Sequence, residues 1–185
     1  MADAAKPLMT PEDFFVWQQN QSERFELVDG VPTEMMAGAS RAHDTIVTNI
    51  IALLRGQLRG SGCYVGTADT AIRTKIRNIR RTDVIVTCDP PRSDVYEAQE
   101  PRLVVEVLSP TNSGSRWDRK MAEYRRHPKL DYILIVDSER VGTTLHIRAA
   151  DGWDFVEADL PDDVIDLSKI GCRLRVADVY DETGI

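Results

Sequence analysis

The sequence predicts a single domain of the α/β or α+β class, with a central mixed β-sheet flanked by helices. Short apolar runs typical of strands alternate with amphipathic helical patterns along the 185 residues. One helical pattern lies between two apolar strands, as in an α-helical crossover. No internal repeat or linker-like stretch divides the sequence, so we expect one domain over residues 1–185.

The first elements are a helix and a hairpin. Residues 1–9 are expected to be a loose lead-in, and Thr10 then supplies the N-cap of a helix that runs to about Asn20. A hairpin is predicted over residues 24–35, because Asp29-Gly30 accommodates the positive φ that a tight turn requires.

A longer amphipathic helix follows the hairpin. Ile46, Ile50 and Leu54 recur at every fourth position, which predicts a helix from about His43 to Arg59. The elements predicted after it are strands near 63–67, 69–77, 80–88 and 102–110, a helix over 115–126, a strand over 131–137, and a hairpin that pairs 143–149 with 153–159.

Charge and hydropathy restrict the protein class. A formal net charge of -7 and a pI near 5.0 argue against indiscriminate coating of nucleic acid, although a local basic patch is compatible with that total. The first residues lack the apolar core of a secretory signal, and no apolar run approaches the roughly 20 residues of a spanning helix. We therefore expect a soluble cytoplasmic protein.

The three cysteines give no motif. Cys63, Cys88 and Cys172 are odd in number, far apart and free of CxxC spacing, so neither a disulfide framework nor a zinc site is suggested. We expect small, buried, reduced side chains.

Two strands each carry one carboxylate in an apolar run. Asp83 lies in RRTDVIVTC and Glu106 in RLVVEVLSP, where an unpaired carboxylate is costly to bury. Because side chains alternate along a strand, two neighbouring strands can direct these acids at one point. Such a point suits Mg²⁺, which takes one or two carboxylates and keeps several waters. The carbonyl of Val107 is a candidate further ligand.

The helix over 115–126 offers a cation to the same point. Trp117, Met121 and Tyr124 form an apolar stripe on this helix. Lys120 lies beside Trp117 and Met121, so its stem can run over apolar neighbours toward the carboxylates. An ammonium there can orient a nucleophilic water or stabilise a phosphoryl oxygen. This combination is typical of metal-assisted phosphodiester hydrolysis.

Basic residues near both acids indicate a phosphate-rich ligand. Arg73, Lys75 and Arg77 stand at alternate positions of an acid-free segment, which would place them on one strand face. The candidate nucleic-acid contacts are Arg73, Lys75, Arg77, Arg80, Arg81, Arg116 and Arg119, with Arg125 and Arg126 adding further cations. An ordinary solvated surface is the alternative interpretation.

The motifs together resemble the Uma-type restriction endonuclease family of the PD-(D/E)XK nuclease superfamily. The resemblance runs through MTPEDFFVW, RFELVDG, GASRAHDTIV, RRTDV, LVVEVLSPT, KMAEY and DYILIVD. It implies a restriction-endonuclease-like fold, Mg²⁺ as cofactor with Mn²⁺ as a substitute, and DNA as substrate. Symmetric cutting of a duplex further suggests a homodimer.

The resemblance also assigns roles. Asp83 matches the first acid, Glu106 the second, and Glu26 an upstream acid. Thr82 stands in place of the motif's proline, and Leu108 in place of the superfamily's lysine. The lysine of this family is expected on the following helix, which matches Lys120.

Other interpretations of these residues remain open at the sequence level. Asp83 can be a strand-edge acid paired with a neighbouring arginine, Glu26 a solvent-facing residue, and Lys120 a snorkelling surface lysine. His43 can contact a phosphate or a site water, or merely cap its helix. As a whole, the chain can be a nuclease-fold protein that binds nucleic acid or a protein partner without cleaving, or a relative that has lost function.

Overall fold

The computed structural model describes residues 8–35, 39–90, 92–109 and 114–185, and it confirms the central mixed sheet flanked by helices. Residues 1–7 of the expected lead-in lie outside the described residues. Among the described helices, none is both long and apolar enough to cross a membrane.

A six-stranded sheet forms the centre of the molecule. All neighbouring strands in it are antiparallel except β7 and β8, which are parallel and joined by the crossover helix α3 (Ser115–Arg126). In spatial order the strands are β10 (Gly152–Ala158), β9 (Thr143–Ala149), β8 (Tyr132–Asp137), β7 (Pro101–Leu108), β6 (Val84–Thr87) and β3 (Tyr64–Thr67).

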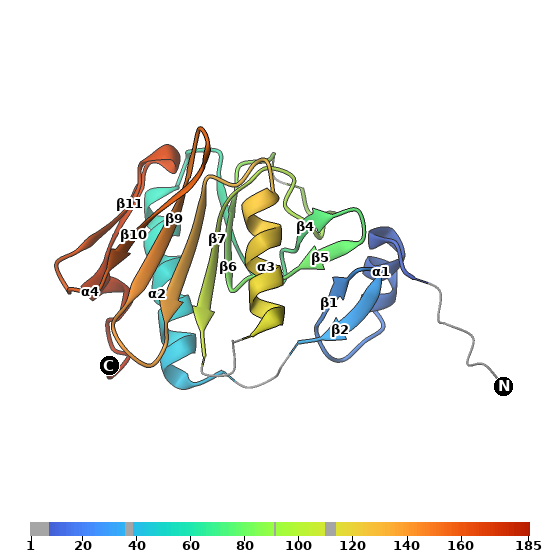
Figure 1. Cartoon of the computed structure of the whole chain (residues 1–185), viewed down its shortest axis with the longest axis horizontal. Coiled ribbons are helices and arrows are strands. Elements are labelled where there is room, and N and C mark those ends of the chain that lie inside the picture. The colour runs from blue at the N-terminus through green and yellow to red at the C-terminus, as the bar shows by residue number, and fades with distance from the viewer. Residues whose placement is uncertain (1–7, 36–38, 91, 110–113) are drawn as a thin grey trace.

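Two helices cover the opposite faces of this sheet (Figure 1). Helix α2 (Arg41–Gln57) packs its apolar stripe against one face, where it contacts Val105 and its odd-numbered neighbours on β7. Helix α3 packs against the other face, in the cluster that contains Val104. Because side chains alternate along β7, Glu106 points to the α3 face together with Val104.

A second, four-stranded sheet lies beside the first. Its spatial order is β2 (Val31–Glu34), β1 (Phe25–Val28), β5 (Asn78–Arg80) and β4 (Ile72–Lys75). Helix α1 (Pro11–Gln18) covers it with Phe14, and Thr10 and Asp13 close a capping box at its start.

Two of the predicted strands are divided differently in the structure. The segment 69–77 contains only the short β4, after which the chain turns at Arg77 into β5. The segment 80–88 is divided because Arg80 ends β5 in one sheet and Val84 begins β6 in the other. Alternating polarity gives no sign of this change of sheet.

The C-terminal elements complete the core on the α2 side. They are β11 (Val164–Leu167), the short 3₁₀ helix Ser168–Ile170, β12 (Cys172–Arg175) and α4 (Val176–Val179). Their apolar residues join the cluster beneath α2.

The expectation for two of the cysteines is wrong. Cys63 and Cys88 form a disulfide, because antiparallel pairing of β3 with β6 places them opposite each other, one position beyond Tyr64 and Thr87. Their separation of 25 residues in sequence gave no indication of that pairing. Cys172 is free and buried in the core, as expected.

Candidate functional site

The two predicted acids meet at the junction of the two sheets. Val84 on β6 pairs with Val105 on β7, and continuing this register by one residue places Asp83 opposite Glu106. Asp83 lies in the link before β6, where its Oδ2 accepts a hydrogen bond of 2.8 Å from the backbone N–H of Val107. The predicted convergence of the acids is therefore present, although Asp83 is not itself in a strand.

Thr82 fixes the link that carries Asp83. Its hydroxyl donates to the backbone carbonyl of Val105, and at 3.2 Å to that of Val84. The side chain that replaces the motif's proline thus ties the link to β7 and to the start of β6.

Lys120 enters the site from α3. Its Nζ lies 2.8 Å from Oε1 and 2.9 Å from Oε2 of Glu106, donates to the Arg81 carbonyl at 2.8 Å, and lies 3.4 Å from Oε1 of Glu26. Only 14% of the side chain is exposed, so it is no snorkelling surface lysine. Lys120 joins the acid of β7 to the acid of β1.

Tyr124 is a site residue that sequence reasoning assigned only to packing. It follows Lys120 by one helical turn, is fully buried, and donates its hydroxyl to Oε1 of Glu106 at 2.6 Å. Both oxygens of Glu106 therefore accept hydrogen bonds from side chains of α3. The spacing of four residues from Lys120 was the available signal.

A buried ion-pair network holds the carboxylate of Glu26 in place. Its Oε2 accepts from Arg80 at 2.9 Å and its Oε1 from the Arg81 backbone N–H at 3.0 Å. Arg80 also makes a bidentate contact with Glu123, at 2.8 and 2.9 Å. Asn78 donates to the same carboxylate at 2.8 Å. The sequence gave no sign that Glu123 would be buried on the inner side of α3.

The prediction that Arg80 and Arg81 contact phosphate is wrong, because both side chains are buried. Arg80 is 1% exposed and its guanidinium is satisfied by two carboxylates. Arg81 is also buried, and it donates to the carbonyls of Phe25, Ala68 and Asp69. Neither side chain is accessible to a phosphate backbone. Pairing of β1 with β5 and the approach of α3 to this sheet were not visible in the local sequence pattern.

The remaining predicted cations lie closer to solvent. Arg77, Arg116 and Arg119 are exposed, and Arg119 makes one surface ion pair with Asp29 at 3.2 Å. Lys75 is 41% exposed and lies 3.6 Å from the buried carboxylate of Glu123. Half-buried Arg73 is paired with Glu12 and Glu97. Arg73, Lys75 and Arg77 do not share the predicted strand face, because β4 ends at Lys75 and the chain turns before Asn78.

His43 reaches the site from the first turn of α2. The hydroxyl of Ser40 caps this helix by accepting from the His43 backbone N–H, and Nε2 of His43 lies 3.7 Å from Oδ2 of Asp83. Pairing with Asp83 raises the pKa of His43 above its usual value despite partial burial, and hydrogen bonding to the Val107 backbone adds to the effect. His43 is therefore oriented toward the acids.

Burial and charge set the protonation of the site. Burial raises the pKa of Glu106 to about 7, and neighbouring Asp83 raises it while Lys120 lowers it. Burial would raise the pKa of Glu26 as well, but Lys120 and Arg80 hold it below the usual range. For Lys120, burial is outweighed by Glu106 and Glu26, so its pKa is raised.

The two acids suit a hydrated divalent cation. Among the described residues no group of three or more histidine, cysteine or acidic side chains forms a metal cage. Mg²⁺ needs none, since it is held by one or two carboxylates and keeps its waters. Repulsion from Asp83 contributes to the raised pKa of Glu106, and a cation between the two would relieve it. Asp83 and Glu106 therefore fit such an ion.

Comparison with known proteins identifies the family. Residues 11–177 match the family model Uma2, described as "Putative restriction endonuclease". The uncharacterized protein slr1290 of Synechocystis sp. is 32% identical over 94% of this chain and 92% of its own length. A second uncharacterized Synechocystis protein, sll1609, is 24% identical over 74% of this chain and 79% of its own length.

A solved structure shares the fold. The crystal structure of "a putative nuclease belonging to DUF820" from Anabaena variabilis superposes with a TM-score of 0.73 and 13% sequence identity, covering 91% of this chain and 96% of that one. With the Uma2 match over residues 11–177, this makes the chain a member of the Uma2 family of restriction-endonuclease-like proteins.

Proposed function

We propose that this protein is a Mg²⁺-dependent DNA endonuclease that hydrolyses phosphodiester bonds, with Mn²⁺ as a substitute ion. The observation that carries the proposal is the convergence of Asp83, Glu106 and Lys120 from a link, a strand and a helix. Membership of the Uma2 family supports nuclease chemistry.

Asp83 and Glu106 would hold the ion, and the carbonyl of Val107 is a candidate third ligand. A divalent cation at this position supplies activation of a water molecule and stabilisation of charge on the phosphoryl oxygens. Glu106 must be deprotonated to act as a ligand, which its pKa of about 7 allows near neutral pH.

Lys120 acts as a hydrogen-bond donor and a positive charge. Because its pKa is raised, it stays protonated at neutral pH and does not serve as a general base. Its ammonium can position the attacking water or stabilise the developing charge on a phosphoryl oxygen. Glu26 holds Lys120 in place, while Tyr124 orients Glu106.

DNA would be held by cations that surround this site. We assign phosphate contacts to Arg73, Lys75, Arg77, Arg116 and Arg119, and leave out Arg80 and Arg81 because both are buried. A C₂ dimer would present two sites to the two strands of a duplex.

The test is cleavage of supercoiled, linear and single-stranded DNA in Mg²⁺ or Mn²⁺. Asp83→Asn should abolish cleavage, and Lys120→Met should slow it by about 10²- to 10³-fold, as for other charge-stabilising donors. Lys129→Ala is the matched control, because Lys129 makes an exposed ion pair with Glu100 away from the acids. Urea unfolding of each variant separates loss of activity from loss of fold.

Two results would refute the proposal. One is the absence of metal-dependent cleavage on every substrate, and the other is equal cleavage by the wild type and Asp83→Asn. Retained DNA binding without cleavage would instead support a nuclease-fold protein that binds nucleic acid without cutting it. The hydrogen bonds that Lys120 and Tyr124 already donate to the two oxygens of Glu106 are the observation that favours that alternative.

A further inference from the structure

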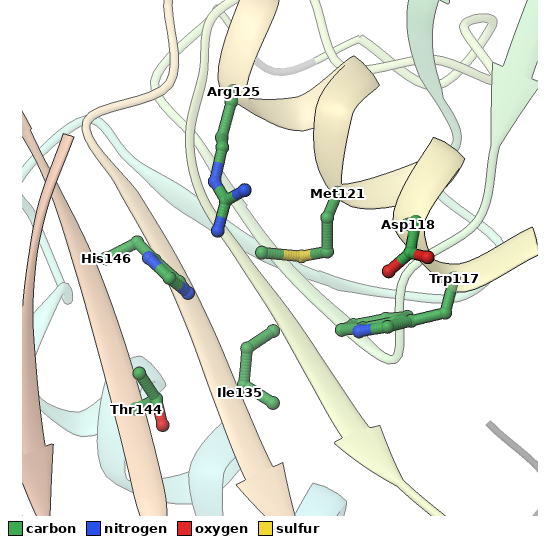
Figure 2. Close-up of a pocket in the computed structure, with 7 residues that line it drawn as sticks. All are labelled: Trp117, Asp118, Met121, Arg125, Ile135, Thr144 and His146. Carbon is green, nitrogen blue, oxygen red and sulfur yellow. The ribbon is translucent and has the colours of Figure 1, made fainter. Parts of the chain in front are cut away.

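A hollow of about 300 Å³ lies on the far flank of α3 from Lys120. Its walls come from α3 on one side and from β8 and β9 on the other (Figure 2). The indole of Trp117 and the imidazole of His146 stand at opposite sides, with Met121 and Ile135 between them. We call it the α3–β9 hollow, lined by Trp117, Asp118, Met121, Arg125, Ile135, Thr144 and His146.

The hollow begins next to the acid site. Glu106 on β7 pairs with Ile135 on β8, which in turn pairs with Thr144 on β9. These three residues form one row across the same sheet face, with strands about 4.8 Å apart. The floor of the hollow is therefore one strand from Glu106, and Trp117 lies one helical turn before Lys120.

Positive charge connects the two places. Exposed Arg116, Arg119 and Arg126 lie on the outer side of α3, between the flank that carries Lys120 and the flank that carries Trp117. Arg125 adds a cation at the hollow itself. A phosphate backbone bound at the acids can cross this outer side, about 10–12 Å wide, and bring a nucleotide a few positions along the strand to the hollow.

The lining suits a flat heterocycle with polar edges. Trp117 offers an aromatic face, and Thr144, His146 and Asp118 offer hydrogen-bonding groups. Burial, followed by the charge of Arg125, lowers the pKa of His146, so its ring is neutral near pH 7 and can both donate and accept. The volume is at the lower end of the range for ligand pockets, which suits one base.

We propose that the α3–β9 hollow binds one unstacked base of the nucleic-acid strand, close to the phosphodiester at Asp83 and Glu106. Trp117 stacks on the base, Thr144 and His146 contact its edge, and Arg125 contacts its phosphate. The position of this base relative to the cut rests on the proposed function, whereas binding of the base does not.

Binding is measured with a mixed-sequence single-stranded deoxyoligonucleotide that carries 2-aminopurine at successive positions. The full chain with Asp83→Asn is used, so that no cleavage occurs. We expect 2-aminopurine fluorescence to change at one or two positions when the strand binds. The same strand in a duplex, and the four deoxynucleoside 5′-monophosphates, test whether the site requires an unpaired base and a continuous backbone.

Two variants test the hollow. Trp117→Ala should weaken strand binding by about 5- to 150-fold, the range expected for one base–aromatic stack, while Trp117→Phe retains most of the affinity. Thr144→Val keeps the volume of the side chain and removes only its hydroxyl, so it tests the hollow even if Trp117→Ala does not fold. Trp17→Ala, which truncates a partly buried tryptophan of another cluster, is the matched control.

The outcomes separate this inference from the proposed function. If the wild type cleaves DNA and folded Trp117→Ala and Thr144→Val bind and cleave as well as it does, the hollow binds no base and the proposed function stands. If the wild type never cleaves but the hollow variants lose strand binding as expected, the inference stands without the nuclease activity. Uniform 2-aminopurine fluorescence along the bound strand overturns the inference.

Discussion

Replacing Arg80 with methionine should destabilise the protein by several kcal/mol. Arg80 is 1% exposed and lies between the carboxylates of Glu26 and Glu123, with three hydrogen bonds of 2.8 to 2.9 Å to them. Methionine keeps an unbranched apolar stem but leaves both acids without this cation. Breaking a buried ion pair on one side costs about 3–5 kcal/mol, because a buried charge loses its partner.

The control for Arg80 lies on β7. Arg102 makes a comparably short ion pair with Asp131, at 2.6 Å, but its side chain is 38% exposed. Water replaces that partner, so Arg102→Met should cost only about 0–1 kcal/mol. Burial is the main difference between the two arginines, and it sets the expected ratio of their effects.

The assay for both variants is equilibrium unfolding in urea, with the free energy extrapolated to zero denaturant. A loss below about 1 kcal/mol for Arg80→Met, or a loss equal to that of Arg102→Met, would refute the reasoning from burial. Folded Arg80→Met should also show an unchanged salt dependence of DNA binding. A reduced slope would mean that Arg80 neutralises a phosphate after all.

Two further predictions concern the surroundings of the acids, and a third concerns the disulfide. Tyr124→Phe should lower stability by about 1.5–3 kcal/mol at pH 8 in urea unfolding, because a buried hydrogen bond to the Glu106 carboxylate is lost; an unchanged value contradicts this. NMR titration of the metal-free protein should give His43 a pKa above 6.5 that falls in Asp83→Asn; the stability from this pair is complete below pH 6.5 and is lost as the pH rises through the folded-state pKa. Reducing the disulfide that joins β3 to β6 should lower the free energy of unfolding by about 3.5 kcal/mol, given a loop of 25 residues. An equal melting temperature with and without reductant would contradict this prediction.

The sequence was informative where a local pattern and a family motif agree. Alternation along the strands predicted that Asp83 and Glu106 would share a face, and the register of β6 with β7 places them opposite each other. The displaced lysine was expected on the helix after β7, and Lys120 lies within 3 Å of Glu106 there. Both inferences used residues whose spacing within one element fixes their direction.

The sequence did not predict contacts that depend on how elements distant in the chain pack together. Arg80 resembles its exposed neighbours in sequence, and only the pairing of β1 with β5 and the approach of α3 make it a buried cation. The cysteine pair depends in the same way on which strand becomes the neighbour of β3. Tyr124 was assigned to packing because an aromatic stripe is the common pattern, although its hydroxyl reaches Glu106. Such contacts are long-range, so composition and periodicity do not encode them.

Helix α3 lines both the acid site and the α3–β9 hollow, and that sharing has a thermodynamic consequence for ligands at either place. Lys120 faces the acids from one flank and Trp117 faces the hollow from the other, within a single turn of one helix. A ligand that shifts or rigidifies this helix from one side changes the free energy of binding on the other. Linkage makes any such coupling reciprocal, so whatever factor an ion at the acids applies to base affinity, the base applies to ion affinity.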